Sequence, residues 1–403
     1  MQDQILSGVR VLDLTRVLAG PWCTQALADM GATVYKIEHT DGGDEIRHSP
    51  PYITSEEGRE SVPYLCVNRG KLSITVDIAK PEGQALLKDI AAKCDVMVEN
   101  FKVGDLARYG LDYASVRKLN PSIVYCSVTG YGQDGPMANQ PGYDPVFQAI
   151  SGMMSTCGIP DGEPGGGPMR SIVPIIDVMT GMVATSSILA ALLHKRAKGI
   201  GQFIDVALLD VAFAATVYLS QAYLATSKVP PRVGNGSFLF APSNCFPCRD
   251  GHIFIQIGND SQWRRLAKAL KKPEWLDDER LLTNASRVSH KELVNASVSL
   301  CTLEWDKQVL SDMLGAAGVP CGPVNDMAQA FAHPQVRHRQ LRMEIDHPTL
   351  GTFEQVRSPF RFSETPVQYV APPVLGEHTH AVLSEMLGMT PDTFANLRAS
   401  RVV

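Results

Sequence analysis

Hydrophobic residues over the first 150 positions follow two alternating patterns. Short β-branched and apolar runs, typical of buried strands, are separated by segments in which apolar positions recur every three or four residues, as in helices. Strands that alternate with helices at this spacing pair in parallel, so the pattern predicts an open, Rossmann-like α/β sheet. The predicted strands lie within 9–14, 33–38, 73–78, 95–100 and 122–132, and the predicted helices within 19–32, 80–93, 105–110 and 113–120.

The segments that follow the predicted strands are where a ligand site is expected. In open parallel sheets, ligands bind beyond the carboxyl ends of the strands, which here lead into 15–21, 100–108 and 129–136. A nicotinamide-binding sheet would carry a GxGxxG turn after its first strand. That turn has only Gly20, followed by Pro21 at the start of the helix, and this disfavours a dehydrogenase.

The pattern changes twice farther along the chain. A Gly- and Pro-rich stretch at 158–168 precedes a long apolar helix, and a second irregular stretch at 226–237 has the composition of a linker. We expect a large domain over 1–225, a smaller α+β domain over 226–325, and a return to the large domain over 326–403.

Composition and charge exclude several classes. The chain is 44% hydrophobic and 20% charged, with a net charge of −5 and no dense basic run, so neither nucleic acid nor an anionic membrane is an expected partner. We expect no secretory signal, and no membrane span because Gly181, Thr185 and Ser186 interrupt the longest apolar run. Nine cysteines among apolar neighbours suit a reducing compartment, so we expect a cytoplasmic protein. No spacing predicts a metal or redox cofactor.

One carboxylate stands in unusually apolar surroundings. Asp177 follows a largely apolar run in the stretch "RSIVPIIDVMTG", which begins at Arg170. A carboxylate there loses hydration unless it is compensated, so it is either well hydrogen-bonded or chemically used. The pattern alone favours a residue that caps the helix after it.

Several motifs, in order, resemble those of the class III CoA-transferases, the group of formyl-CoA and carnitine CoA-transferases. The similarity runs from about residue 6 to the C-terminus. The motifs are "GVRVLDLTRVLAGP", "NRGKLSITVDI", "DVMVENF", "GYGQDGP", "PGYDPVFQAISG", "GQFIDVALLD" and "GVPCGPVND".

The resemblance carries expectations of fold and chemistry. It implies an intertwined homodimer, whose subunits each have a Rossmann-like large domain built from both chain ends and a smaller domain from the middle. It also implies transfer of CoA between carboxylic acids through thioester and anhydride intermediates on one aspartate, which matches Asp177. The CoA thioester is then a substrate, and no permanently bound cofactor is expected.

This chemistry agrees with what a partly buried carboxylate can do. A carboxylate that attacks the acyl carbon divides the transfer into acyl exchanges that conserve the activated bond. Desolvation strengthens the nucleophile and raises its pKa, whereas a helix starting near Val178 offsets part of that rise.

The resemblance also implies a set of site residues. Leu18 stands where the formyl-CoA enzymes have glutamine, and His39 stands where they have arginine. An arginine such as Arg108 can pair with phosphate, although a surface ion pair is the simpler interpretation. The matched CoA-binding positions are Leu18, Ala19, His39, Val76, Asp77, Ile78, Ala79, Asn100, Phe101 and Arg108, and the substrate-binding positions are Arg16, Tyr143, Asp144 and Arg170.

Arg16 replaces a histidine of the formyl-CoA enzymes. An arginine there suggests that a second substrate carboxylate is held. The "TRVLAGP" variant also resembles the subgroup that uses succinyl-CoA and dicarboxylic acids, which implies succinyl-CoA as donor and a dicarboxylate or its analogue as acceptor. A formyl-CoA:oxalate-type transferase is an alternative function that these residues do not exclude.

An α-methylacyl-CoA racemase would carry a histidine base where Tyr143 stands, and a phenol is a poor base near neutral pH. A non-enzymatic CoA-binding scaffold is disfavoured because Asp177 is present. Asp144 has the alternative role of a helix cap.

Overall fold

The computed structural model describes residues 4–403 as two compact units. Unit 1 contains the residues up to Gly152, Ser171–Gln221 and Arg337–Val403, and unit 2 contains Met153–Arg170 and Ala222–Val336. The smaller unit is therefore wider than the expected 226–325, because it includes the Gly- and Pro-rich stretch at 158–168 and extends to 336.

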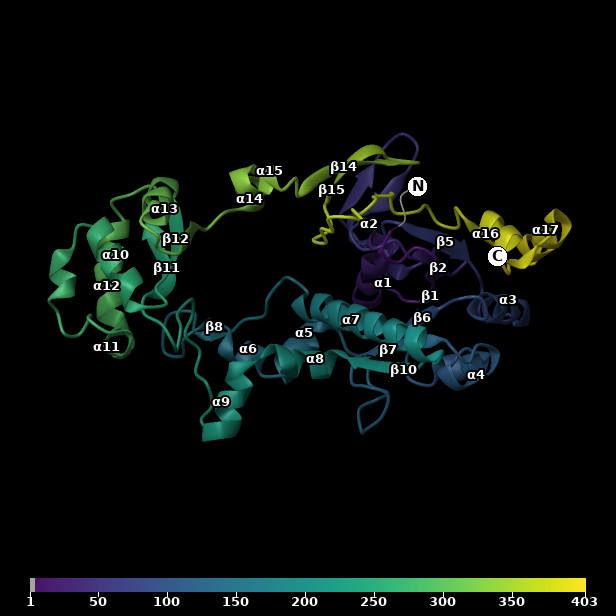
Figure 1. The fold of residues 1–403 in the computed structure, drawn as a ribbon, viewed down its shortest axis with the longest axis horizontal. Coiled ribbons are helices and arrows are strands. Elements are labelled where there is room, and N and C mark those ends of the chain that lie inside the picture. Colours follow the sequence, from purple (N-terminus) through teal and green to yellow (C-terminus); the bar gives the residue numbers. More distant parts are fainter. Residues whose placement is uncertain (1–3) are drawn as a thin grey trace. The chain divides into compact units, whose positions relative to one another are not determined.

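Unit 1 is built on a six-stranded sheet in which every pair of neighbouring strands is parallel, as predicted (Figure 1). The sixth strand was not predicted, because its five residues run directly into an apolar helix. The order across the sheet is β10 (Phe203–Ala207), β7 (Val124–Thr129), β6 (Val96–Glu99), β1 (Arg10–Asp13), β2 (Thr33–Glu38) and β5 (Lys71–Thr75).

Helices and two hairpins complete unit 1. The predicted helical segment at 105–110 is a 3-10 helix, η2. The helices are α1 (Ala19–Asp29), η1 (Glu45–His48), α2 (Val62–Leu65), α3 (Pro81–Ala91), η2 (Asp105–Tyr109), α4 (Tyr113–Leu119), α5 (Asp144–Ile150), α7 (Ile175–Lys198), α8 (Leu208–Ala215), α16 (Thr379–Leu387) and α17 (Pro391–Ala399). The hairpins are β3 (Tyr52–Thr54) with β4 (Arg59–Ser61), and β14 (Arg342–His347) with β15 (Gly351–Val356).

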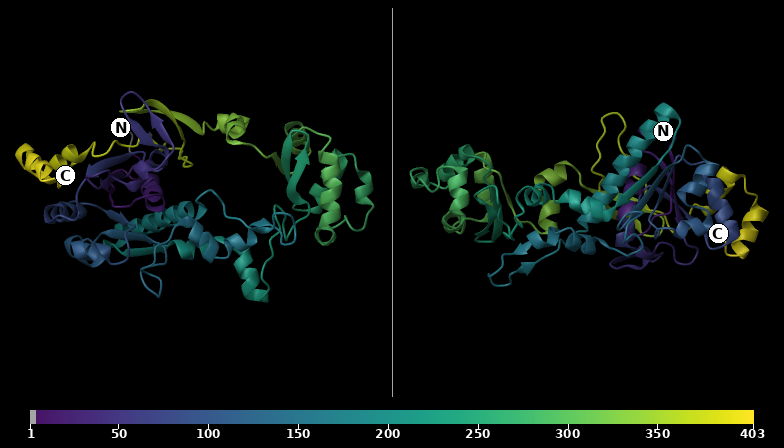
Figure 2. Two further views of the ribbon diagram at one scale, coloured as in Figure 1. Left: turned by 180° about the vertical axis from the view of Figure 1, so that it is seen from behind. Right: turned by 90° about the horizontal axis from the view of Figure 1, so that it is seen from below.

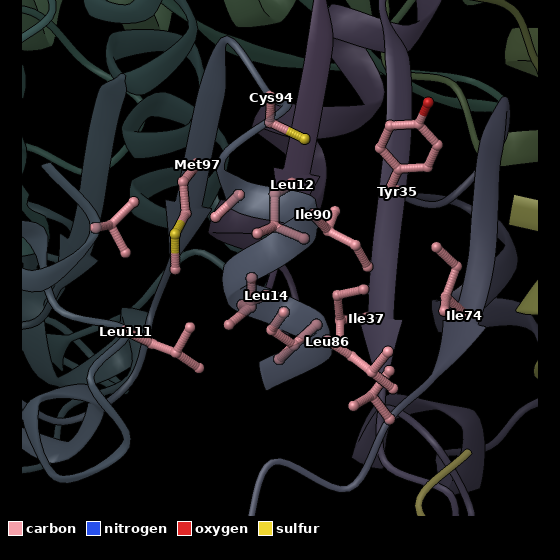
Figure 3. Close-up of a cluster of buried hydrophobic side chains, with 14 of the residues drawn as sticks. Leu12, Leu14, Tyr35, Ile37, Ile74, Leu86, Ile90, Cys94, Met97 and Leu111 are labelled. Atoms are coloured by element: carbon pink, nitrogen blue, oxygen red, sulfur yellow. The ribbon is translucent and has the colours of Figure 1, made fainter. Parts of the chain in front are cut away.

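The main core of unit 1 lies between the sheet and α3. Successive strand side chains alternate between faces, so Leu12, Ile37 and Ile74 point to the same side and meet Leu86 and Ile90 of α3 (Figure 3). On the opposite side, α1 and α7 pack against each other.

The C-terminal segment completes this core. Leu383 and Val402 are buried in the same cluster as the N-terminal strands. Figure 2 shows the yellow C-terminal helices beside the part of unit 1 formed by the first half of the chain.

Unit 2 contains a three-stranded antiparallel sheet, β11 (Ser243–Cys248), β12 (Gly251–Gln256) and β13 (Cys321–Pro323), around which helices bury a separate core. Cys245 and Cys248 both lie on β11 as free thiols. The other elements are α6 (Met153–Thr156), β8 (Gly158–Ile159), β9 (Gly167–Pro168), α10 (Asp260–Ala269), η3 (Pro273–Leu276), α11 (Asn284–Ser289), α12 (Lys291–Thr302), α13 (Lys307–Ala316) and α14 (Met327–Ala332). Helices α9 (Tyr218–Thr226) and α15 (Pro334–His338) cross the unit boundaries.

Helix α7 has 24 residues and is apolar enough, by length and composition alone, to cross a bilayer. Core helices of globular proteins satisfy the same criterion, and Ile176, Ala184, Ile188 and Ala191 of α7 are fully buried within unit 1.

Candidate active site

A cavity of about 230 Å³ opens at the carboxyl ends of β1, β6 and β7. The order of strands and helices along the chain predicts a ligand site at this edge of the sheet. The cavity brings together the loop after β1, the first residues after β6, the segment 138–143 and the first turn of α7. It includes these predicted site residues: Arg16, Leu18, Ala19, Asn100, Phe101, Tyr143 and Asp177.

Asp177 is the third residue of α7, which begins at Ile175 rather than near Val178. It therefore lies inside the first turn and does not cap the helix, contrary to the interpretation favoured by the local pattern. The cap comes from Asp144 instead, whose Oδ2 accepts hydrogen bonds from the backbone N–H groups of Ile176 (2.7 Å) and Asp177 (3.1 Å). Asp144 does not cap its own helix α5, whose N-cap is Tyr143; the helix that it caps is α7.

The surroundings of Asp177 raise the pKa of its carboxyl group to about 7. Burial is the larger cause, because it disfavours the charged form, and the nearby negative charge of Asp144 adds to it. The positive end of α7 acts in the opposite direction on a carboxylate in its first turn. Asp177 is therefore available in both protonation states near neutral pH.

The carboxylate of Asp144 is also held by a side chain of its own helix, α5. It is 3% exposed, and its Oδ1 accepts a hydrogen bond from Nε2 of Gln148, one turn later on α5. Oε1 of Gln148 accepts the N–H of Ser171 (2.9 Å), which lies in the segment leading to α7. These bonds join the start of α5 to the start of α7 and so determine where Asp177 stands.

Arg16 is held in the cavity through its main chain. Its N–H donates to Oδ1 of Asn100 (2.9 Å), and its carbonyl accepts from Nδ2 of the same side chain (2.8 Å). The guanidinium carbon lies 4.8 Å from the centre of the Phe101 ring, a cation–π arrangement. Because β1 and β6 are neighbours in the sheet, residues far apart in sequence meet at this edge.

Tyr143 lines the cavity just before α5, with 67% of its surface exposed. Leu18 and Ala19 line it where α1 begins. No histidine is among the described residues that line the cavity.

The other predicted site residues do not line this cavity. His39 is exposed and accepts the N–H of Asp41 at Nδ1 (3.0 Å), and Arg108 is exposed beside Asp105. Val76–Ala79 follow β5, where the N–H of Asp77 donates to the carbonyl of Val402 (2.8 Å). Arg170 belongs to unit 2. Roles for these residues in binding CoA or substrate stay predictions.

Two charged residues of the cavity, Lys102 and Glu45, were not predicted from the sequence. Lys102 follows Asn100 and Phe101 directly, so its place after β6 was a usable signal. Glu45 lies on η1, and no pattern placed that short helix near β1. Within residues 4–403, no three His, Cys, Asp or Glu side chains are grouped as a metal site would require.

Comparison with known proteins identifies the family to which this chain belongs. The model of CoA-transferase family III matches residues 6–379. The succinate–glutarate CoA-transferase of Agrobacterium fabrum is 44% identical over 94% of this chain and 95% of its own length. The succinyl-CoA:glutarate CoA-transferase of Homo sapiens is 39% identical over 99% of this chain and 90% of its own length.

A solved structure shows the same fold. The crystal structure of a CaiB/BaiF family protein from Brucella suis is similar with a TM-score of 0.85 and 37% identity, covering 96% of this chain and all of that one. The resemblance drawn from the motifs is confirmed, and the chain is a member of CoA-transferase family III.

Proposed function

We propose that this enzyme transfers CoA from succinyl-CoA to a dicarboxylic acid such as glutarate, with Asp177 as the nucleophile. The observation that carries the proposal is the shared cavity: a carboxylate with a pKa of about 7 and the side chain of Arg16 line the same small space. The names of the relatives from Agrobacterium fabrum and Homo sapiens, both glutarate transferases, support the choice of substrates.

The reaction takes place as two matched exchanges at Asp177. The carboxylate attacks the thioester carbonyl of succinyl-CoA, which forms a mixed anhydride and releases CoA thiolate. The thiolate then attacks the aspartyl carbonyl, which forms an aspartyl-CoA thioester and releases succinate. The acceptor carboxylate and the same thiolate repeat these two steps in reverse order, which regenerates Asp177. No step passes the activated bond to water, so its energy is conserved.

The side chains around Asp177 suit this sequence. Arg16 can pair with the carboxylate of the substrate that does not react, since a guanidinium binds a carboxylate through two parallel hydrogen bonds. Lys102 brings a second positive charge to the same cavity. The backbone N–H of Asp177 is already engaged by Asp144, so Asp177 itself is held in place while its side chain reacts.

The proposal extends to assembly and location. By resemblance to the family, the active form is a homodimer in the cytoplasm.

Two measurements test the transferase proposal. Incubation with succinyl-CoA and no acceptor should leave CoA attached to the peptide that carries Asp177, as seen by mass spectrometry, and Asp177→Ala should abolish the adduct and lower kcat by at least about a thousandfold. Glutarate and other C4–C5 diacids should surpass oxalate and carnitine in an acceptor panel with succinyl-CoA. Full activity of Asp177→Ala, or a strong preference for oxalate or carnitine, would overturn the proposal.

A further inference from the structure

The main chain around Arg16 is anchored by buried side chains from other parts of the sheet. Beyond the two bonds to Asn100, the carbonyl of Thr15 accepts a hydrogen bond from Nζ of Lys36 (3.0 Å). The N–H of Val17 donates to Oδ1 of Asp44 (3.2 Å). The peptide groups on both sides of Arg16 are thus held by an ion pair that does not itself line the cavity.

This ion pair is completely enclosed. Nζ of Lys36 lies 2.9 Å from Oδ2 of Asp44, and both side chains have no exposed surface. Burial alone would lower the pKa of Lys36, but the charges of Asp44 and Asp13 outweigh it and raise this pKa above its ordinary value. Oδ1 of Asp44 also accepts the N–H of Ile46 (3.2 Å) at the start of η1. Lys36 comes from β2, so the pair ties the loop after β1 to the neighbouring strand.

Val17 shows why such an anchor is needed. Its φ is +70°, in the left-handed region that β-branched residues avoid. A residue in this conformation persists only where its surroundings impose it. The bonds to Asp44 and Lys36 supply that restraint, and the turn they maintain places Arg16 at the cavity while Leu18 leads into α1.

We propose that the buried Lys36–Asp44 pair is the positioning device for Arg16, and that it sets the preference of the enzyme for acceptors with two carboxylates. The inference rests on the proposed function, in which Arg16 binds the carboxylate that does not react. Lys36 and Asp44 act only through the loop and are positioning residues.

The test compares a diacid with a monoacid of similar length. The readout is the ratio of kcat/KM for glutarate to that for butyrate, with succinyl-CoA as donor. The double variant Lys36→Met/Asp44→Ala removes both charges together and leaves no unpaired buried charge. We expect it to lower the ratio about tenfold, mainly through a higher KM for glutarate, because a misplaced Arg16 loses a charge-assisted hydrogen bond.

A matched control is available in the same unit. Arg69 and Asp29 form another buried ion pair, with Nη2 and Oδ2 2.5 Å apart, and neither residue lines the cavity. Arg69→Met/Asp29→Ala should lower the melting temperature to a similar degree but leave the acceptor ratio unchanged. An equal loss of the ratio in both double variants, or an unchanged ratio in Lys36→Met/Asp44→Ala, would overturn the inference.

Two further variants distinguish a failure of the role proposed for Arg16 from a failure of the positioning role proposed for Lys36 and Asp44. Arg16→Ala should lower the same ratio by about 10- to 100-fold. If Arg16→Ala has no effect, the assignment of Arg16 in the proposed function fails; if only Arg16→Ala has an effect, the positioning role of Lys36 and Asp44 fails. The isosteric Asp44→Asn serves as a second probe of the pair, because its single amide oxygen cannot accept both from Nζ of Lys36 and from the N–H groups of Val17 and Ile46, and it should also lower the ratio.

Discussion

At the scale of single residues, Asp144 influences Asp177 in two ways. Its carboxylate caps α7, which fixes the position of Asp177, and its negative charge adds to the rise in the pKa of Asp177 that burial causes. The first effect is geometric and the second electrostatic. A substitution that keeps the shape but removes the charge can therefore separate them.

The acidic limb of the pH–activity profile should report the ionisation of Asp177. A carboxyl group with a raised pKa is protonated below that pKa and cannot attack, so kcat/KM for succinyl-CoA should fall as the pH drops through about 7. Asp144→Asn removes the neighbouring charge, lowers the pKa of Asp177 and should move this limb to lower pH. The measurement is the pH dependence of kcat/KM in both proteins.

A control distinguishes this local effect from a change in total charge. Asp89 is exposed on α3, away from the cavity lining, and Asp89→Asn removes the same charge. Its profile should match that of the unmodified protein. An acidic limb that stays in place in Asp144→Asn would contradict the electrostatic role.

Residues of the site differ in how far sequence could predict them. Arg16 was found within a recognisable motif, and Asp177 was found by its position between the Gly- and Pro-rich stretch and the motif "GQFIDVALLD". The cap on α7 could not be found, because Asp144 lies 33 residues before the N–H that it accepts and no local pattern joins the two. Likewise, nothing in the sequence around Val17 indicates its positive φ, which depends on Asp44 from another loop.

At the scale of elements, the close packing of α1 on α7 determines the shape of the cavity. Gly181 lies one turn after Asp177, where a Cβ would come within 2.8 Å of the carbonyl oxygen of Ala19 and 3.3 Å of the Cβ of Trp22. Ala19 lines the cavity, so the missing side chain at Gly181 allows α1 to begin beside the nucleophile.

Gly181→Ala should therefore destabilise the protein and impair catalysis together. The added methyl group meets backbone that can give way only by moving the start of α1, and overpacking of this kind typically costs about 1–3 kcal/mol. We expect a lower midpoint in urea and a kcat reduced about tenfold or more, because small displacements of reacting groups are costly.

A second helical glycine provides the control. Gly315 lies within α13 of unit 2, and a Cβ there would have no neighbour within 4 Å. Gly315→Ala should raise stability by about 0.5–1 kcal/mol through helix propensity alone and leave kcat unchanged. Equal stability changes in the two variants would show that the α1–α7 contact is not tight.

At the scale of the whole molecule, unit 1 has an apolar groove that its own chain leaves open. The groove has a volume of about 1,280 Å³, and residues of α7 and of the segment around Phe360 line it. Leu193 of α7 lines it with 71% of its surface exposed. Exposed apolar surface of this extent is typical of an interface, and the homodimer that we propose would place a second copy of this chain there.

Light scattering coupled to gel filtration should give twice the mass of one chain. Leu193→Asp should shift the protein towards the mass of one chain or lower its melting temperature, because a charge enters the interface. Leu300, on α12 of unit 2, is equally exposed and does not line the groove, so Leu300→Asp is the matched control and should have neither effect. A single-chain mass for the unmodified protein would refute the dimer.

Local patterns along the chain were enough to predict most of the elements and the fold class. Apolar positions that alternate in strands, or recur every three or four residues in helices, are local properties. Five strands of the parallel sheet and the edge where ligands bind were therefore predictable. The motifs identified the family, and the position of Asp177 relative to them identified the nucleophile. Only the tertiary structure decided which charges share the cavity, where α7 begins and what caps it, and how wide the smaller unit is. These features depend on contacts between residues far apart along the chain, which no local spacing encodes.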